Sequence, residues 1–395
     1  MNLRRTLLML MCLLAVAFVF QTMQRTGWLL LPALAEESHM SDPFAGESIV
    51  WVHVFNEQGE LTGPVPSPRV VKPDEVWRDQ LGDERYRILR RAGTEKPFCG
   101  TLLDNKIEGV YTCAGCGLPL YASDAKFNSG TGWPSFFKPV APANITEHRD
   151  TSHGMIRTEI RCARCDGHLG HVFNDGPAPT GQRHCLNSES LLFTPKDQLA
   201  ELADPFAYQP ATDDQGLATA VLAGGCFWCT EAVFEPVDGV VDVVSGYAGG
   251  SAETANYEAV CSGTTDHAEA IRITYDPNRV SYIKLLELFF HMAHDPTQLN
   301  RQGNDVGRQY RSAVFYADEK QKMATSAYIR LLEESRYFSQ PIVTTLEPLT
   351  EFFPAEAYHQ DYARENPDQP YIRHVAQPKV DKLKEKYRDI MENEK

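Results

Sequence analysis

The chain has 395 residues, more than the roughly 100–200 residues of one ordinary domain, so its length predicts two domains. It is acidic, with a formal net charge of −15, and its Lys and Arg residues are mostly scattered singly. Binding to nucleic acid phosphates needs a basic face, so this charge argues against a nucleic acid partner.

The first 35 residues have the features of an export signal or of an uncleaved membrane anchor. Arg4 and Arg5 precede an apolar run over 6–20, and a small-x-small site follows at 33–35. The apolar run is shorter than the about 20 residues that cross a membrane, which favours the signal over the anchor. We therefore expect an exported, periplasmic protein, held at the membrane only if this segment is retained.

A polar segment over 36–74 contains the alternating run Ile49–Phe55, a turn at 58–59 and a proline-rich stretch at 64–68. This pattern predicts a small β extension of unknown purpose. Helical spacing over 73–93 then leads into a first domain over 75–205. The glycines, aromatic residues and short alternating runs of that domain predict a mainly β fold.

A polar linker over 206–217 precedes a second domain over 218–375. Its pattern predicts helices and strands in alternation, which is typical of an α/β or α+β fold. We expect strands at 219–223, 240–244, 270–275, 312–316 and 342–346, and helices at 281–294 and 318–337. A charged helix with a solvated face is expected over 376–395.

Four of the ten cysteines form two CxxC pairs, Cys113 with Cys116 and Cys162 with Cys165. Four thiolates complete a closed tetrahedral shell around zinc, which then stabilises the fold without reacting. A pair of disulfides is the alternative, since disulfides persist in oxidising compartments. The spacing favours structural Zn²⁺, and we expect no organic cofactor.

Two further cysteines are candidate nucleophiles. Cys226 follows an expected strand and the glycine pair 224–225, which predicts a position at the start of a helix. A helix N-terminus favours the thiolate, the reactive form of cysteine. Cys185 directly follows Arg183 and His184, two cationic candidates. The sequence therefore predicts two thiol active sites.

Long runs around both thiols resemble the methionine sulfoxide reductases and together cover most of residues 77–370. The runs that resemble the A type are GGCFWCTEAVF from Gly224, YEAVCSGTTDHAEAI from Tyr257, HDPTQLNRQGNDVGRQYRS from His294 and YHQDYARENP from Tyr358. Those that resemble the B type are EKPFCGTLLDNKIEGVYTCAGCGLPLY from Glu95, FNSGTGWPSF from Phe127, SHGMIRTEIRC from Ser152 and CDGHLGHVFNDGPAPTGQRHCLNS from Cys165. The resemblance implies a B-type domain of antiparallel sheets, stabilised by zinc, followed by an A-type domain with a two-layer α/β sandwich.

For the first domain the resemblance implies that Cys185 is the nucleophile and that Trp133 packs against the substrate methyl group. Attack on the sulfoxide sulfur builds negative charge on oxygen, which donors or acids must meet. The resemblance assigns that role to His168, His171, Arg183 and Asn187. For the two histidines, a structural or metal-binding pair is the alternative.

Thr131 departs from many B-type members, which have a cysteine at this position. Apart from Cys185 and the two CxxC pairs, this domain contains only Cys99. We expect Cys99 to resolve the sulfenic acid on Cys185 by forming a Cys99–Cys185 disulfide.

For the second domain the resemblance implies that Cys226 is the nucleophile and Glu269 the acid that protonates the sulfoxide oxygen. A carboxyl acid near neutral pH needs a raised pKa, which burial supplies. Glu231 is the rival acid and is ranked second, as structural. The resemblance implies substrate or supporting contacts from Phe227, Trp228, Tyr257, Asp305 and Tyr310.

No cysteine follows Cys261 in the sequence, so the C-terminal resolving cysteines of some A-type members are absent. We expect Cys229 to resolve Cys226, because CxxC spacing at a helix start permits a short disulfide. Cys261 is expected to be a buried residue that packs as a small hydrophobe without a redox role.

These assignments predict a repair enzyme that reduces both epimers of methionine sulfoxide, since each reductase type takes one epimer. The resemblance assigns the R epimer to the B-type domain and the S epimer to the A-type domain. Each thiolate would form a sulfenic acid and then a disulfide, which a thioredoxin-like protein or a membrane thiol relay would reduce. A general thiol–disulfide oxidoreductase centred on Cys226 and Cys229, or a zinc-stabilised binding module, would leave Glu269 and Cys185 unexplained.

Overall fold

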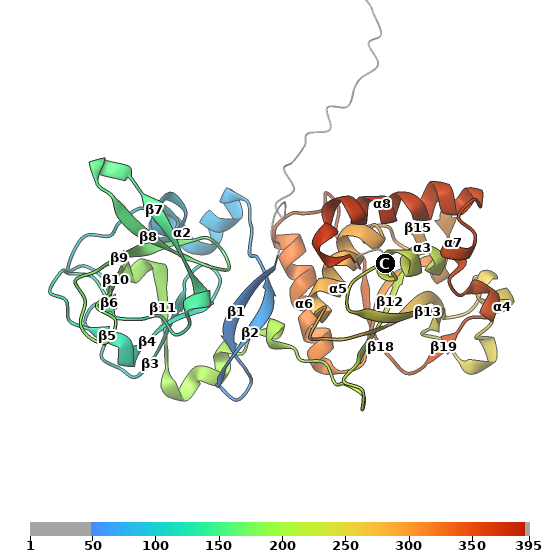
Figure 1. Ribbon diagram of the computed structural model, residues 1–395, viewed down its shortest axis with the longest axis horizontal. Coiled ribbons are helices and arrows are strands. Elements are labelled where there is room, and N and C mark those ends of the chain that lie inside the picture. Colours follow the sequence, from blue (N-terminus) through green and yellow to red (C-terminus); the bar gives the residue numbers. More distant parts are fainter. Residues whose placement is uncertain (1–48, 392–395) are drawn as a thin grey trace, which may run out of the picture. The chain divides into compact units, whose positions relative to one another are not determined.

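The structure is a computed structural model that describes residues 49–391 (Figure 1). The expected export signal or anchor over 1–35 lies outside the described residues. Within 49–391, no helix combines the length and the apolar character needed to cross a membrane.

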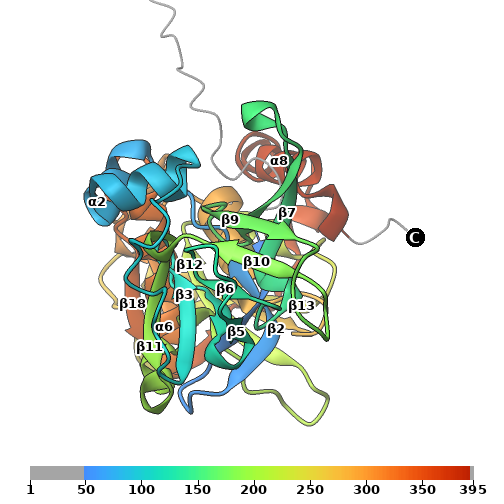
Figure 2. The same cartoon turned by 90° about the vertical axis from the view of Figure 1, so that its left-hand side faces the viewer.

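The first domain consists mainly of short antiparallel strands (Figures 1 and 2). One sheet has six strands in the order β5-β6-β10-β9-β8-β7, and a second has three in the order β11-β3-β4. The strands are β3 (Gly109–Cys113), β4 (Pro119–Ala122), β5 (Lys126–Phe127), β6 (Ser135–Phe136), β7 (Ile145–Asp150), β8 (Arg157–Cys162), β9 (His168–Phe173), β10 (Arg183–Leu186) and β11 (Leu191–Pro195).

One long helix, α2 (Asp74–Arg91), accompanies these sheets. It contains a non-helical residue, Gly82, at φ 70°, a backbone conformation that glycine adopts without steric cost. Its apolar residues Trp77, Leu81 and Leu89 are buried in the core of this domain. The helix expected over 73–93 is therefore present, with a break near its middle.

The expected β extension is a hairpin of β1 (Ile49–Phe55) and β2 (Leu61–Pro68). Its residues Val52, Val54 and Val65 are buried in the same cluster as Trp77. The Asn144 side chain also accepts a hydrogen bond from the His53 backbone N–H and donates one to the His53 carbonyl, each at 2.7 Å. The hairpin is therefore part of the first domain's core, a role that the sequence pattern did not indicate.

The second domain has a six-stranded sheet in the order β18-β17-β12-β14-β13-β19. All neighbouring pairs are antiparallel except β17 with β18, which is parallel. The strands are β12 (Ala218–Gly224), β13 (Val240–Ala248), β14 (Ala268–Tyr275), β17 (Ser312–Tyr316), β18 (Thr345–Pro348) and β19 (Phe352–Pro354), with a separate short pair, β15 (Arg301–Gln302) and β16 (Asp305–Val306).

The helices of this domain are α3 (Phe227–Phe234), α4 (Tyr257–Cys261), α5 (Tyr282–Leu288), α6 (Glu319–Glu334), α7 (Tyr362–Glu365) and α8 (Gln377–Lys386). The helix expected over 281–294 divides into α5 and a π-helical turn, η8 (Phe289–Ala293). A similar turn, η11 (Ile372–Ala376), precedes α8. The charged helix expected over 376–395 ends at Lys386 in the structure.

The central strand β12 contributes side chains to both faces of the sheet. Ala220 and Leu222 belong to a large apolar cluster that also holds Leu285 of α5 and Leu332 of α6. Val221 and Ala223 belong to a smaller cluster on the other face. Alternation along a strand produces this division. β12 ends at Gly224, two residues before the candidate nucleophile Cys226.

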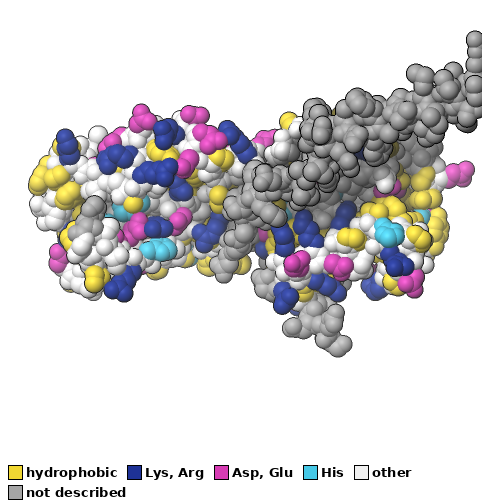
Figure 3. All heavy atoms as spheres, turned by 90° about the horizontal axis from the view of Figure 1, so that it is seen from above, with side chains coloured by type: hydrophobic (Ala, Val, Ile, Leu, Met, Phe, Trp, Pro, Cys, Tyr) yellow, Lys and Arg dark blue, Asp and Glu magenta, His cyan; other side chains and the backbone are white. Residues whose placement is uncertain are grey.

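Charged side chains of both signs are interspersed on the face of the first domain shown in Figure 3. This distribution agrees with the scattered Lys and Arg residues of the sequence. The face shows no continuous basic stripe of the kind that binds a phosphate backbone.

Two candidate active sites and a candidate metal centre

Four cysteines of the first domain form a compact sulfur cluster. Cys113 ends β3 and Cys162 ends β8, while Cys116 and Cys165 lie in the turns that follow these strands. The four sulfur atoms lie within 4.8 Å of one another. The Cys113–Cys165 sulfurs are 3.6 Å apart and the Cys116–Cys162 sulfurs are 3.5 Å apart, and all four cysteines are free.

This geometry fits a metal ion. With Zn–S bonds near 2.3 Å, a tetrahedron of thiolates places its sulfurs about 3.8 Å apart. Four protein ligands leave no open position, which is typical of a structural site. A buried cation, Arg164, donates to the Cys116 carbonyl at 2.6 Å and forms an ion pair with Asp204, so it can offset the negative charge of such a cluster.

Cys185 lies on β10 in a small cavity of about 120 Å³. Trp133, His171 and Asn187 line the same cavity, so the structure brings together four of the expected site residues. The Trp133 ring is fixed by a hydrogen bond from its Nε1–H to the Glu95 carbonyl at 3.2 Å. An aromatic wall beside a thiol suits a substrate that combines an apolar methyl group with a polar S–O bond.

Burial raises the pKa of the Cys185 thiol. The nearby Arg183 charge opposes this effect, and so do hydrogen bonds with Thr131 and Ser135. The Thr131 Oγ1 lies 4.0 Å from the Cys185 Sγ. Thr131, which departs from the expected family pattern, therefore lies beside the candidate nucleophile.

Arg183 and Asn187 are both held by protein partners. The Arg183 guanidinium donates to both carboxylate oxygens of Asp175, at 2.9 and 2.8 Å, and lies over the Phe173 ring. The Asn187 side chain accepts from the Glu95 N–H at 3.0 Å and donates to the Leu169 carbonyl at 3.1 Å. Arg183 is not among the residues that line the cavity.

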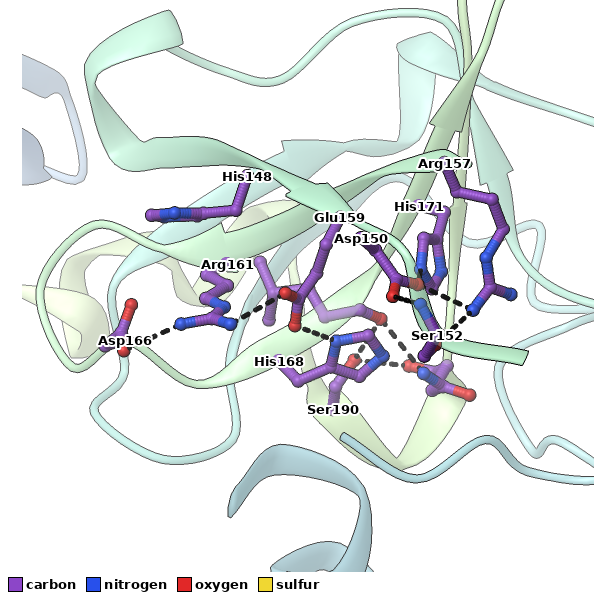
Figure 4. A network of polar contacts seen from close by, with 12 residues as sticks. His148, Asp150, Ser152, Arg157, Glu159, Arg161, Asp166, His168, His171 and Ser190 are labelled. Carbon is purple, nitrogen blue, oxygen red and sulfur yellow. Dashed lines mark hydrogen bonds and ion pairs between the residues drawn. The ribbon is translucent and has the colours of Figure 1, made fainter. Parts of the chain in front are cut away.

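Two carboxylate–histidine pairs lie side by side (Figure 4). His171 Nε2 is 2.8 Å from Asp150 Oδ2, and Asp150 also accepts from Arg157 at 2.6 Å. His168 Nδ1 is 2.6 Å from Glu159 Oε1. The centroids of the two imidazole rings are 5.5 Å apart, so the two histidines contact each other edge to face.

The two histidines differ in their position relative to Cys185. His171 pairs with Cys185 across β9 and β10 and lines the cavity. His168 is buried and is not among the residues that line the cavity. Burial lowers the pKa of His168 despite the nearby Glu159 carboxylate. His171 is therefore the candidate for contact with substrate, and His168 is the candidate for a supporting role.

Cys99 is exposed on the loop before β3. The backbone N–H of the preceding residue, Phe98, donates to the Gly132 carbonyl at 2.8 Å. Gly132 lies between Thr131 and Trp133, both beside Cys185. The loop that carries the expected resolving cysteine is thus attached to the segment that borders the nucleophile.

In the second domain, Cys226 lies at the junction of β12 and α3. Gly225 has φ 91°, which lets the chain turn from strand to helix, and the Cys226 carbonyl accepts the first helical bonds, from Cys229 N–H at 3.1 Å and Thr230 N–H at 3.3 Å. The position at the helix N-terminus is as predicted. The expected effect on the thiol is wrong, because burial raises the pKa of Cys226 well above its ordinary value.

Glu269 lies on β14 and reaches the same helix start. Its Oε2 accepts a hydrogen bond from the Phe227 backbone N–H at 3.1 Å. Its side chain is buried, and burial raises its pKa to about 8. Burial also raises the pKa of the rival acid, Glu231, to about 8, but it is the Glu269 carboxylate that accepts a hydrogen bond from the residue that follows Cys226.

The walls of this second site are aromatic. The Trp228 ring stacks on Tyr362 with centroids 3.9 Å apart, and its Nε1–H donates to His359 Nδ1 at 3.2 Å. Phe227 and Tyr257 also contact the His359 ring, with centroids 5.1 and 4.4 Å away. His359 therefore orients three of the expected substrate residues.

Burial is the main reason that the pKa values of Tyr257 and Tyr310 are raised, and the charges of Glu269 and Cys226 raise both pKa values further.

Cys261, expected to be buried, is exposed at the end of α4. That prediction is wrong, because a short surface helix turns this side chain outward.

Cys229 is buried one helical turn after Cys226. Its Sγ donates to the Tyr371 hydroxyl at 3.8 Å, and that hydroxyl donates to Asp305 Oδ2 at 2.5 Å. The interaction with Cys226 lowers the pKa of Cys229. The expected site residues Cys229 and Asp305 are thus connected through a tyrosine that the sequence analysis did not single out.

The partners of the expected residues were not predicted from the sequence. In the first domain these are Asp150, which lies two residues before the run from Ser152, and Arg157 and Glu159, which lie inside that run without having been singled out. In the second domain they are His359 and Tyr371. The run from Tyr358 contained His359, whereas Tyr371 lies beyond its end, among residues without a motif.

Comparisons with known proteins match the two domains separately. A family model described as "SelR domain" matches residues 81–195, and one described as "Peptide methionine sulfoxide reductase" matches residues 218–391. The MsrB of Agrobacterium fabrum is 58% identical over 129 residues, which cover 33% of this chain and 96% of that protein.

Two further relatives match the second domain. The MsrA of Nautilia profundicola is 56% identical over 163 residues, which cover 41% of this chain and 92% of that protein. The protein named MsrA 2 of Synechocystis sp. is 52% identical over 179 residues, which cover 45% of this chain and 84% of that protein.

Proposed function

This chain belongs to the methionine sulfoxide reductases, as a B-type domain followed by an A-type domain, and on that premise we propose how its two thiols divide and complete the reaction. The family membership establishes reduction of methionine sulfoxide by both domains. We assign the R epimer to Cys185 in the first domain and the S epimer to Cys226 in the second. The observation that carries this proposal is that each domain places one cysteine beside an aromatic wall and a candidate acid.

Each domain would use the same first step. The cysteine sulfur attacks the sulfoxide sulfur, the S–O bond breaks, and the oxygen passes to the cysteine as a sulfenic acid while methionine leaves. The acid donates a proton to the sulfoxide oxygen and then recovers the proton that the thiol loses. The step therefore consumes no other reactant. The acid would be Glu269 in the second domain and His171, held by Asp150, in the first.

The raised pKa values of Cys185 and Cys226 imply that both cysteines rest as thiols. Each thiolate would then form only with substrate bound, when the partly positive sulfur of the sulfoxide approaches the cysteine sulfur. Such a site keeps its nucleophile protonated between turnovers. Protonation protects the nucleophilic cysteine from oxidants between turnovers, because the thiolate is the form that oxidants attack.

In the second step a second cysteine attacks the sulfenic acid, forming a disulfide and releasing water. We assign this role to Cys99 in the first domain and to Cys229 in the second. Support comes from the loop contact between Phe98 and Gly132 and from the position of Cys229 one turn after Cys226. An external dithiol then reduces each disulfide.

The zinc site would supply no chemistry in this cycle. A Zn²⁺ ion held by Cys113, Cys116, Cys162 and Cys165 would join the ends of β3 and β8, which belong to different sheets. It would thereby fix the relative position of the two sheets that form the first domain.

We also propose that the protein acts after export and is recycled there by a thioredoxin-like protein or a membrane thiol relay. The sequence features of residues 1–35 support export. Fractionation of cells that produce the full chain would locate it, and a periplasmic thioredoxin-like protein should sustain turnover without added small thiols. Recovery of the chain in the cytoplasm would contradict the proposal.

The division of labour is tested by epimer-resolved assays of Cys185→Ser and Cys226→Ser with a small dithiol as reductant. The first variant should lose reduction of the R epimer and keep that of the S epimer, and the second should show the reverse. Each variant serves as the folding control for the other. Loss of both activities in either variant would contradict separate sites.

A further inference from the structure

Cys229, Tyr371 and Asp305 form a continuous chain of hydrogen bonds close to Cys226. The Cys229 thiol donates to the Tyr371 hydroxyl at 3.8 Å, and the Tyr371 hydroxyl donates to Asp305 Oδ2 at 2.5 Å. The Tyr371 ring also contacts Trp228, with centroids 6.3 Å apart and planes at 75°. Tyr371 therefore occupies a fixed position between a buried sulfur and a carboxylate.

The second step of the cycle needs such an arrangement. A thiol must lose its proton before its sulfur can attack a sulfenic acid, because the thiolate is the nucleophile. Cys229 is only 1% exposed, and Ile372 and Ala376 of η11 pack against it in one cluster. Water has little access to this proton, so a protein group must receive it.

We propose that Tyr371 and Asp305 form a proton relay that activates the resolving thiol Cys229, an inference that rests on the proposed role of Cys229. The Cys229 proton passes to the Tyr371 oxygen while the Tyr371 proton passes to Asp305. Asp305 lies on β16 of a short hairpin and is partly exposed, so it can return the proton to solvent.

The Cys229 S–H bond and the Cys226 S–OH bond break, and a Cys226–Cys229 S–S bond forms. The hydroxyl group leaves as water with a proton from Glu269, while the Cys229 proton ends on the Tyr371 oxygen and the Tyr371 proton ends on Asp305, so the proton count is unchanged. The sulfenic sulfur of Cys226 is reduced and the sulfur of Cys229 is oxidised, each to the disulfide level.

The surroundings of Cys229 support this direction of proton transfer. The groups that act on its charge are Cys226, Tyr371 and Lys379, which favour the thiolate, and Asp305, which opposes it. Glu269 is the remaining acid of the site and responds to the charge of Cys229. Asp305 carries the charge that disfavours the Cys229 thiolate, so protonation of Asp305 removes that repulsion as the thiolate forms.

The relay is tested by measuring the two steps separately in the full chain. Reduced enzyme is mixed with one equivalent of the S epimer. Released methionine and loss of the first free thiol report the first step, and loss of the second free thiol, with disappearance of the trappable sulfenic acid, reports the second. In Tyr371→Phe the second step should slow by about 10²-fold, the lower end for loss of an acid–base group, with sulfenic acid accumulating. The first step should change by less than the second.

The second step of Tyr371→Phe should also depend more steeply on pH than that of the wild type, because hydroxide must then remove the thiol proton. A loss of packing alone would not change this dependence. Asp305→Asn should slow the second step as well, and Tyr316→Phe, which removes a tyrosine hydroxyl at the end of β17, should leave both steps unchanged.

The outcomes separate the relay from the function on which it rests. If Cys229→Ser still completes many turnovers, Cys229 is not the resolving residue and the proposed second step fails. If Cys229→Ser stops after one turnover but Tyr371→Phe forms the disulfide at the wild-type rate, the relay is wrong. Equal slowing of both steps in Tyr371→Phe would also overturn it.

Discussion

The carboxylate of Glu269 accepts a hydrogen bond from the backbone N–H of Phe227, at 3.1 Å. This contact brings a buried acid from β14 to the first residue of α3, directly after Cys226. Burial raises the pKa of Glu269 to about 8, so the group is largely protonated at neutral pH and able to donate.

Reduction of the S epimer should therefore depend on protonated Glu269. The first step should slow as pH rises through about 8, because the acid loses its proton there. In Glu269→Gln this slowing should disappear and the rate should fall roughly 10²–10⁴-fold, the usual contribution of a general acid. Single-turnover assays between pH 6 and 10 would show it. Reduction of the R epimer by the same variant is the control.

The same residue should weaken the fold at high pH. Its folded-state pKa is raised from 4.5 to about 8, so stability is fullest below about 4.5 and declines as pH rises towards 8. Glu269→Gln removes this ionisation. The variant should gain thermal stability over the wild type at pH 9 by more than it gains at pH 5, as measured by calorimetry. Equal differences at both pH values would contradict the burial argument.

Asp150 should matter for the R epimer because it orients His171. Hydrogen bonds from Ser152, and then from His171 and Arg157, lower the pKa of Asp150, so it remains ionised. Asp150→Asn should reduce the R-epimer rate by at least about tenfold, less than the full effect of losing an acid. Glu147→Gln, on the exposed side of the same strand, is the matched control and should have wild-type activity.

Removal of the metal should affect only the first domain. The purified chain should contain one zinc ion, measured by elemental analysis, and Cys116→Ser should lose it. Because metal binding is coupled to folding, that variant should lose R-epimer reduction and part of its folded structure, and keep S-epimer reduction. Cys99→Ser, which lies outside the sulfur cluster, should retain the zinc. A fully active zinc-free protein would show that the four cysteines need no metal.

Disulfide mapping after one turnover with the R epimer should find Cys99 linked to Cys185. The exposed loop can bring Cys99 to the sulfenic acid, since it is attached at Gly132, beside the cavity. Cys99→Ser should release one equivalent of methionine and then stop unless a small thiol is supplied. Continued turnover of Cys99→Ser with a protein reductant alone would exclude this assignment.

Much of this organisation could be predicted from the sequence. The CxxC spacing predicted a four-sulfur cluster, and the strand followed by two glycines predicted Cys226 at a helix start, because both depend on local chain geometry. Burial could not be predicted in the same way. Cys261 was expected to be buried and is exposed. The thiolate expected at Cys226 is disfavoured because elements distant in the sequence bury this thiol and raise its pKa.

Partners across the fold were also beyond the sequence patterns. Asp150 and His171 are 21 residues apart, and Cys229 and Tyr371 are 142 residues apart, so no motif spans either pair. The hairpin at Ile49–Phe55 was recognised as β structure, but its packing with Trp77 depends on tertiary contacts. Local signals indicated the candidate cysteines, and the structure identified the side chains that contact them.

The two proposed disulfides differ in how a reductant could approach them. Cys99 is exposed on a loop. Cys226 and Cys229 are only 8% and 1% exposed, and Trp228 and Tyr371, which contact each other, lie close to them. A partner protein could dock directly on the first disulfide, but the second would require a local opening of η11. The rate at which the Cys226–Cys229 disulfide is reduced would then be limited by this local opening. The two domains would therefore return to the reduced state at different rates.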